Sequence, residues 1–416
     1  MEDRIVQRRA LSLPAVLTLA AVMALLEYFF IVSLNSGETR IAAWIVAAGL
    51  LTLFVLILGS ANFARYRRIF FVASALLFFP SFIAVLIESR GAMFLDTRQI
   101  FLNETPMCPI VIPLVIVPWA VNGTLVFPAR LTNHFASVYA MLSIWLVGTL
   151  TIGRGWCSWV CFYGGWDDGA SRVLAKPRLA LRDGNKRIRY FNFAVLAFCV
   201  LAGLATLTCV YCSWLCPFKL VTEYVKVADA ASYLAMIMFV LLFFSLAIVL
   251  PLLTRRRVQC MSLCPFGAFQ SLVGKASLYR VKIDADRCTS CGACAKACPV
   301  MAIDTTEKPR VLATCTLCGE CVAACSRQAL AYQFAWSRAC GTPKSLAAGW
   351  LERLNARGIT RGLRVGAARF LLDVFSPRAL MSTTAFTIGM IICGSFTVGT
   401  VARVIHLFTT GSFLLQ

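Results

Sequence analysis

Seven long apolar stretches constrain this chain more than any other feature. A helix that crosses a membrane needs about 20 mostly apolar residues, and each stretch comes close to that length. The chain is 59% hydrophobic and only 14% charged, whereas a soluble globular chain is roughly a quarter charged. This composition excludes an ordinary cytosolic protein, and the abundant apolar surface excludes a disordered one. The expected spans are Leu13–Leu34, Ile41–Gly59, Ile69–Ile87, Phe135–Gly153, Tyr190–Leu207, Ala230–Leu253 and Thr384–Leu407.

The distribution of basic residues predicts the orientation of these spans. With the N-terminus in the cytoplasm, the cytoplasmic side holds 33 of the 40 Lys and Arg residues and the opposite side holds seven. The positive-inside rule applies mainly to short loops, and the count without segment 255–383 is still 14 to seven. We therefore expect a multi-pass protein of the bacterial inner membrane with its C-terminus in the periplasm. The net charge of +21 then reflects topology and anionic lipid, and no nucleic-acid partner is expected.

Two cysteine runs predict a ferredoxin module. Residues 288–299 read CTSCGACAKACP and residues 315–325 read CTLCGECVAAC, so both contain C-x2-C-x2-C-x3-C. Four thiolates at this spacing bind a [4Fe–4S] cluster, and the fourth cysteine of each run serves the other cluster. A zinc site would use CxxC pairs with a longer gap. We assign one cluster to Cys288, Cys291, Cys294 and Cys325, and a second to Cys298, Cys315, Cys318 and Cys321.

Two further cysteine pairs follow expected spans that end on the cytoplasmic side. Cys157 and Cys161 close the fourth span, and Cys260 and Cys264 close the sixth. A CxxxC spacing places two sulfurs about one helical turn apart on one face. Together the pairs could supply four ligands to a third cluster at the inner face. The alternative is four structural thiols, because a free cysteine often behaves as a small hydrophobic residue.

A last cysteine group is expected on the periplasmic side. The run Cys209-Val-Tyr-Cys212-Ser-Trp-Leu-Cys216-Pro217 follows the fifth span, and Cys108 precedes Pro109 in another outer loop. These four cysteines predict a fourth cluster at the outer face. Disulfides such as Cys209–Cys212 or Cys108–Cys216 are the alternative in an oxidising compartment, and a redox-active CxxC is a third interpretation.

These motifs resemble a known group of proteins. The sequences GRGWCSWVC (153–161) and CMSLCPFGAFQSLVGKASLYRV (260–281), with the tandem ferredoxin runs behind them, are similar to membrane polyferredoxins. That group is associated with periplasmic nitrate reductase, nitrous-oxide reductase maturation, methylamine dehydrogenase and cbb-type oxidase assembly. The resemblance covers roughly residues 140–335 and implies a membrane-embedded electron carrier that serves a periplasmic redox enzyme or its maturation. Phe162 departs from the proline that usually follows the CxxxC motif in the group.

The remaining candidate residues are few. Cys199, Cys393 and Cys340 are expected to pack rather than to bind metal. His134 and His406 lie at outer span ends, where a bis-His haem or a proton acceptor for quinol is conceivable. Glu27 lies inside the first span, where a carboxylate is costly and marks a functional position by default. A quinone pocket is one interpretation of Glu27, and a polar partner on a neighbouring helix is the other.

The expected fold class is an α-helical integral membrane protein of about seven transmembrane helices with an inserted cytoplasmic 2[4Fe–4S] ferredoxin-like α+β domain. The expected divisions are helices 1–4 in 1–153 with a periplasmic loop 88–134, a cytoplasmic CxxxC loop 154–189, helices 5–6 in 190–253, a CxxxCP linker 254–284, the ferredoxin domain 285–336, a basic amphipathic segment 337–383 and helix 7 in 384–408.

The expected function is electron transfer. We find no dinucleotide-binding motif, P-loop, paired carboxylates or nucleophilic triad, so an electron carrier is favoured over a stand-alone enzyme and no catalytic residue is assigned. Electrons would pass between a cytoplasmic donor or the quinone pool and a periplasmic redox protein, with other membrane subunits as partners in the bilayer. The alternatives are a cupric-ion or disulfide reductase that matures a metalloenzyme, since soft thiolates select Cu(I), and a redox sensor.

Overall fold

The computed structural model describes residues 11–37, 39–90, 112–116, 128–131, 134–181, 186–206, 210–219, 230–305, 309–337 and 361–415. Within these residues the chain is mostly helical, with short two-stranded sheets.

The N-terminal part of the chain forms three packed helices. Helix α1 (Leu13–Glu27) has Pro14 in its first turn, where the missing N–H of proline costs no hydrogen bond. The π-helical turn η2 (Tyr28–Val32) extends it, and α2 (Thr39–Gly59) and α3 (Phe63–Arg90) follow. Helix α2 packs against both α1 and α3. Helices α1 and α2 are almost wholly apolar, as expected of helices that lie in lipid, whereas α3 carries arginines in its first turns.

Five helical segments in the described part of the chain are long and apolar enough to cross a membrane. This agrees with the expected class of an integral membrane protein. The five segments are Leu13–Val32, Thr39–Gly59, Phe63–Val85, Tyr233–Thr254 and Pro377–Thr410.

Two of the seven expected spans correspond to shorter helices. The apolar parts of α6 (Val138–Thr151) and α9 (Lys186–Thr206) are Leu142–Thr151 and Tyr190–Thr206. Helix α6 stops where Gly153 adopts a φ of +55°, a left-handed conformation that glycine accommodates readily. Both apolar parts are shorter than the five long segments that the described residues contain.

The last helix starts earlier than expected. Helix α18 (Pro377–Thr410) begins at Pro377 instead of Thr384, because the Ser376 hydroxyl accepts a hydrogen bond from the Ala379 N–H at 3.2 Å and caps it. Before it stands α17 (Arg361–Val374), which occupies part of the expected amphipathic segment. Residues 338–360 of that segment lie outside the described residues.

Short helices and turns connect the long ones in the central part of the chain. They include the pieces that carry the CxxxC cysteines. In chain order the remaining elements of this part are η3 (Ile112–Ile116), β1 (Pro128–Leu131), β2 (His134–Ser137), η4 (Gly153–Gly155), α7 (Trp156–Trp159), α8 (Phe162–Ala170), η5 (Tyr211–Leu215), α11 (Ala230–Leu242), η6 (Phe243–Val249), α12 (Leu250–Thr254), η7 (Gln259–Leu263), α13 (Pro265–Val273) and η8 (Gly274–Ala276).

An aromatic core anchors α3 to its neighbours. Phe70 stacks on Phe386 of α18 with ring centroids 4.2 Å apart, and Phe78 stacks on Phe162 of α8 at 3.9 Å. Such aromatic pairs contribute about 0.5–1.5 kcal/mol beyond the area that they bury. Phe162 directly follows Cys161, so this packing fixes the start of α8 and with it the end of the first CxxxC motif.

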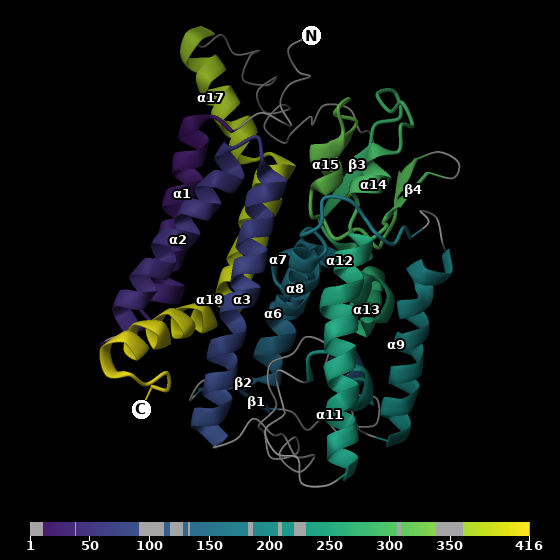
Figure 1. Ribbon diagram of the computed structural model, residues 1–416. Helices are drawn as coiled ribbons and strands as arrows, with labels where there is room; N and C mark the ends of the chain where they lie inside the picture. Colours follow the sequence, from purple (N-terminus) through teal and green to yellow (C-terminus); the bar gives the residue numbers. More distant parts are fainter. Residues whose placement is uncertain are drawn as a thin grey trace.

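The ferredoxin region is built from two small antiparallel ladders and two short helices. Strand β3 (Tyr279–Ile283) pairs with β6 (Leu330–Phe334), and β4 (Ile303–Asp304) pairs with β5 (Arg310–Val311). Helices α14 (Ala293–Ala297) and α15 (Glu320–Ala324) lie between the strands in sequence. Figure 1 shows this region at one end of the helix bundle, while the β1–β2 hairpin lies at the opposite end.

Candidate iron–sulfur sites

Four predicted ligands line one cavity, which we call the first site. Cys288, Cys291, Cys294 and Cys325 border one small pocket that opens to solvent. Cys291 is exposed, and a hydrogen bond from the backbone of Ala293 holds the pKa of its thiol below the usual value. Cys325 comes from the other cysteine run, so the structure brings together the set that the crossed-ligand spacing predicts.

The other four ferredoxin cysteines form a more enclosed group, which we call the second site. Burial, together with the neighbouring Cys318 thiolate, raises the pKa of Cys315 to about 12. Burial likewise raises the pKa of Cys318 to about 11. Cys298 is among the thiolates that act on Cys315, Cys318 and Cys321. Thiolates that crowd one another away from water need a cationic partner, and an iron–sulfur core supplies one.

The two halves of the ferredoxin region repeat each other with the same local backbone. Gly292 and Gly319 follow the second cysteine of their runs, with φ of +71° and +79°. Near the end of each run, the Ala302 N–H donates to Cys298 Sγ at 3.2 Å and the Ala329 N–H donates to Cys325 Sγ at 3.3 Å. Each loop thus presents its sulfurs in the same way and supplies a hydrogen bond to the fourth one.

The two CxxxC pairs meet and form a group that we call the inner site. Cys161 ends its turn with φ −69° and ψ 106°, and Cys264 ends its turn with φ −76° and ψ 110°. Burial and then the Cys157 thiolate raise the pKa of Cys264 to about 12. Burial also raises the pKa of Cys260, on which Cys264 and Cys161 act as further negative neighbours. The structure therefore brings the four predicted sulfurs of this group together.

Buried positive charge surrounds the inner site. Four arginines of this region are at most 8% exposed, and Asp167 and Asp168 are buried beside them. Arg67 also pairs with Glu320, whose side chain is 12% exposed. A buried charge is costly unless it has a partner, and a [4Fe–4S] cubane with its four thiolates is a negatively charged group that such arginines could stabilise. The four arginines are Arg67, Arg154, Arg256 and Arg257.

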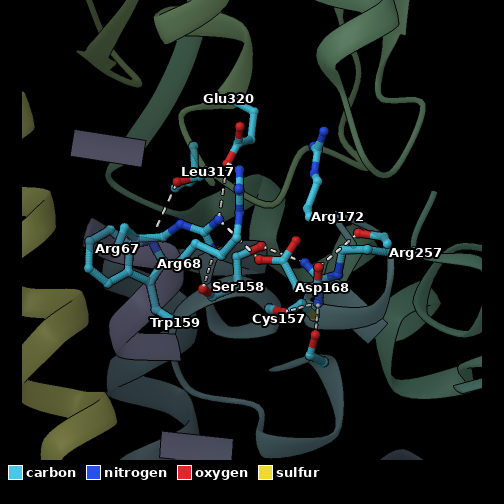
Figure 2. A network of polar contacts seen from close by, with 12 residues as sticks. Arg67, Arg68, Cys157, Ser158, Trp159, Asp168, Arg172, Arg257, Leu317 and Glu320 are labelled. Carbon is cyan, nitrogen blue, oxygen red and sulfur yellow. Dashed lines mark hydrogen bonds and ion pairs between the residues drawn. The ribbon is translucent and has the colours of Figure 1, made fainter. Parts of the chain in front are cut away.

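A polar network joins the second site to the inner site (Figure 2). Arg67 donates to the Ser158 carbonyl at 2.9 Å, to Asp168 at 3.1 Å and to Glu320 at 3.4 Å. Ser158 lies between the two cysteines of its CxxxC motif, and Glu320 lies between Cys318 and Cys321. One buried guanidinium therefore contacts both loops that carry predicted ligands.

Two more side chains cross the same junction. The Trp159 indole N–H donates to the Leu317 carbonyl at 3.4 Å, and Arg154 Nη1 donates to the Thr314 carbonyl at 2.8 Å. Both carbonyls lie in the loop that carries Cys315 and Cys318. Because these contacts involve main-chain atoms on the ferredoxin side, they fix the position of the loop instead of a single side chain.

Cys212 and Cys216, which we call the third thiol group, lie beside the inner site. Tyr211 precedes Cys212, and its hydroxyl accepts a 2.7 Å hydrogen bond from Gln259 of η7. Phe218 packs on Tyr163 of α8 with ring centroids 4.3 Å apart. Sequence analysis expects this group and the inner pairs on opposite membrane faces. In the structure, Tyr211 and Phe218, which flank Cys212 and Cys216, contact η7 and α8 beside the inner site.

Several candidates lie outside the described residues or outside these groups. Cys108, Cys209 and Cys340 are outside the described residues, as is the side chain of His134 on β2. Cys199 and Cys393 are buried, and His406 lies near the end of α18. Glu27 is 2% exposed, and its Oε1 has no hydrogen-bond partner. Of the described candidates, Cys199 lies close enough to Cys212 for the two sulfurs to interact.

Among the described residues, no three His, Cys, Asp or Glu side chains are close enough to hold a single metal ion.

Sequence analysis missed the buried arginines of this region. Arg154 and Arg257 each precede the first cysteine of a CxxxC motif by three residues. That shared spacing is visible in the sequence and indicates a common role for the two arginines. The charge pattern alone treats them only as topology-determining residues at the membrane face.

Comparisons with known proteins agree with this chemistry. A 4Fe-4S binding domain family matches residues 281–304, a second one matches 312–328, and a third matches three times, at 134–180, 190–227 and 236–284. These matches indicate that the chain is similar to membrane-associated polyferredoxins. Each of the three repeated matches contains one CxxxC motif, and the middle one contains Cys212 and Cys216.

The chain also resembles individual curated proteins. It is 28% identical over 179 residues to YccM of Escherichia coli, whose name suggests an electron transport role; the match covers 41% of this chain and 48% of YccM. It is 49% identical over 55 residues to the methylamine utilization ferredoxin-type protein MauN of Paracoccus denitrificans, covering 13% and 19%. MauN of Methylobacillus flagellatus is 28% identical over 179 residues, covering 40% and 56%. The chain thus spans about half of these relatives or less, and no solved structure matches it.

Proposed function

We propose that this polyferredoxin carries electrons across the bacterial inner membrane, between a cytoplasmic donor or the quinone pool and a periplasmic redox partner. The first and second sites hold [4Fe–4S] clusters, the inner site holds a third, and Cys212 and Cys216 contribute to a fourth with Cys108 and Cys209. The family matches and the relatives' ferredoxin-type and electron-transport names support an iron–sulfur electron-transfer role. The number of clusters, the partners and the direction are our inference.

The observation that carries this proposal is the Arg67 contact between the two cluster-binding loops. Arg67 bonds to Ser158 inside the first CxxxC motif and to Glu320 inside the second ferredoxin run. Its side chain is fully buried. A cluster in the second site and a cluster in the inner site would therefore lie on the two sides of one immobile side chain. This arrangement favours a fixed relay over a ferredoxin domain that swings away from the membrane.

Exposure sets the order of the relay. A [4Fe–4S] cluster takes up and releases one electron at a time. Cys291 of the first site is exposed, so this site is the one that a soluble donor can approach. Cys318 and Cys321 of the second site are buried, and their loop faces the CxxxC turns. We therefore infer the order first site, second site, inner site and third thiol group.

Topology belongs to the same proposal. We infer seven transmembrane helices, with α6 and α9 as the two short ones, and a cytoplasmic N-terminus and ferredoxin domain. Labelling of single cysteines introduced at exposed positions with an impermeant maleimide, in intact cells, tests the orientation. The proposed orientation fails if Val173 or Leu179, exposed between α8 and α9, becomes labelled from the periplasm after substitution by cysteine.

Iron analysis and EPR of anaerobically purified protein test the relay. Four clusters predict about sixteen iron atoms per chain. About twelve atoms together with a titratable disulfide would favour the metal-ion or disulfide reductase instead. A Cys157→Ser variant should lose the inner cluster's signal and stall electron flow while the first and second signals remain. Unchanged spectra and unchanged flow would reject the inner cluster.

A further inference from the structure

Two of the three CxxxC motifs share their flanking residues. An arginine stands three residues before the first cysteine, at 154 and 257, and a glycine stands three residues after the second, at 164 and 267. The helix that follows each motif, α8 or α13, has nine residues in both cases. The N–H groups of Cys161 and Cys264 bond to the carbonyls of Trp156 and Gln259, each at 3.0 Å. The two motifs are therefore repeats in structure as well as in sequence.

Arg257 reaches from its own motif into the other one. Its Nη2 donates to the Cys157 carbonyl at 2.5 Å and to the Gly164 carbonyl at 3.2 Å. The same nitrogen lies 3.4 Å from Cys260 Sγ, the first sulfur of its own motif. The Arg257 side chain is fully buried, so its charge acts on these groups without screening by water.

Arg154 makes the corresponding contacts in the opposite direction. Its Nη2 lies 3.4 Å from the Cys260 carbonyl, and its side chain also hydrogen-bonds to the Cys157 thiol. Each arginine thus holds the first cysteine of the other motif through the main chain and donates to the first sulfur of its own motif. The relation is reciprocal.

The two glycines make room for the guanidinium groups. A Cβ at Gly164 would lie 2.4 Å from Arg257 Nη2, and a Cβ at Gly267 would lie 3.3 Å from Arg154 Nη2. Any larger residue at 164 would displace the arginine or the chain. Each glycine therefore accommodates one arginine, and Gly164 and Arg257 are packed more tightly than Gly267 and Arg154.

We infer that Arg154 and Arg257 are reciprocal positioning residues of the inner site, which assemble it from two motifs and raise the reduction potential of its cluster. Hydrogen bonds to the ligand sulfurs and nearby charge are among the factors that set a cluster's potential. Reduction adds negative charge, so a buried guanidinium that donates to a ligand sulfur favours the reduced form. This inference rests on the proposed inner cluster.

The middle motif provides a comparison within the same chain. Cys209 stands where the other motifs have arginine, and Lys219 stands where they have glycine. The sequence around Cys212 and Cys216 therefore lacks both the arginine and the glycine of the other two motifs. The inference accordingly predicts a special dependence on arginine for the inner cluster alone.

Potentiometric EPR titration of Arg257→Gln and Arg257→Lys tests the inference. Glutamine removes the charge and should lower the midpoint potential of the inner cluster by at least 59 mV, a tenfold change for a one-electron couple. Lysine keeps the charge and should restore most of that loss. Arg255→Gln is the matched control, because Arg255 Nη1 donates to the exposed Ala175 carbonyl. It should leave all midpoints unchanged.

Each outcome of this experiment has a defined meaning. Selective loss of the inner cluster's iron in Arg257→Gln, with both ferredoxin signals intact, supports the positioning role. If that variant cannot be isolated, Arg154→Gln replaces it, and Gly164→Ala should cause a larger loss than Gly267→Ala. Full iron with the wild-type midpoint in both Gln variants, or an equal shift in the Arg255 control, overturns the inference. A wild-type protein with only about eight iron atoms would instead overturn the proposed inner cluster.

Discussion

Removal of Arg67 should destabilise the junction between the ferredoxin region and the helix bundle. Arg67 and Asp168 are both 0% exposed and lie 3.1 Å apart. Removing one partner of a buried ion pair leaves an uncompensated charge and costs about 3–5 kcal/mol. Arg257 also acts on Asp168, so we expect Arg67→Met to cost about 3 kcal/mol, the lower end of that range. The double variant Arg67→Met/Asp168→Asn removes both charges and should recover most of the loss.

Denaturant titration of the purified protein in detergent, followed by tryptophan fluorescence, measures these free energies of unfolding. Arg68→Met is the matched control. Arg68 also pairs with Glu320, but its side chain is 26% exposed, and such pairs typically contribute about 0–1 kcal/mol. The reasoning is refuted if Arg67→Met costs no more than Arg68→Met. It is also refuted if the double variant is as unstable as the single one, because the loss would then come from packing instead of charge.

Other single changes test further parts of the structure. Gly319→Ala should be much more destabilising in a thermal unfolding assay than Gly292→Ala: both have positive φ, but a Cβ at 319 would lie 2.7 Å from the Phe63 ring and a Cβ at 292 meets nothing within 4 Å. Gly292→Ala should lower the free energy of unfolding by only about 1–2 kcal/mol. Cys291→Ser should remove the first cluster's EPR signal and leave the second. Although burial raises the pKa of Asp168, nearby arginines lower it more, so the net pKa lies below the ordinary 3.8. The stabilisation by Asp168 is therefore complete above that value and lost as pH falls through the lower folded-state pKa; unfolding measured against pH should show this loss, and Asp168→Asn should abolish it.

The ferredoxin region could be predicted from the sequence because its ligands are local. Cys288, Cys291 and Cys294 lie within seven residues, and only Cys325 comes from the other run. The turn geometry leaves little freedom for such closely spaced ligands. The structure brings these four side chains around one cavity, which agrees with the predicted grouping.

The placement of the third thiol group could not be predicted in the same way. The rule that relates basic residues to membrane sides assigns whole loops, and it carries no information on a turn that folds back between helices. The turn that carries Tyr211 and Phe218 folds back because Tyr211 accepts a hydrogen bond from Gln259 and Phe218 packs on Tyr163. Those contacts depend on residues about 50 positions away in the chain.

The boundaries of one expected span differ from the structure for a related reason. Hydropathy counts apolar residues, but it does not distinguish a span from a short helix followed by an apolar turn. The segment Phe135–Gly153 has the hydropathy of a span, yet His134–Ser137 is a strand and Gly153 begins a turn. Tertiary packing overrides the hydropathy pattern in that segment.

Charge explains why the junction holds arginine at all. Lysine could also supply a positive charge, but Arg154, Arg256 and Arg257 each contact more than one main-chain carbonyl, and the fixed fork of a guanidinium suits that task. Arg256 donates to the Ala295 carbonyl at 3.1 Å, while Arg255 and Arg257 reach Ala175 and Cys157. Three consecutive arginines thus join a surface loop, the ferredoxin helix α14 and the first CxxxC motif. Because their partners are main-chain atoms, these contacts hold the ferredoxin region against the helix bundle through the backbone itself.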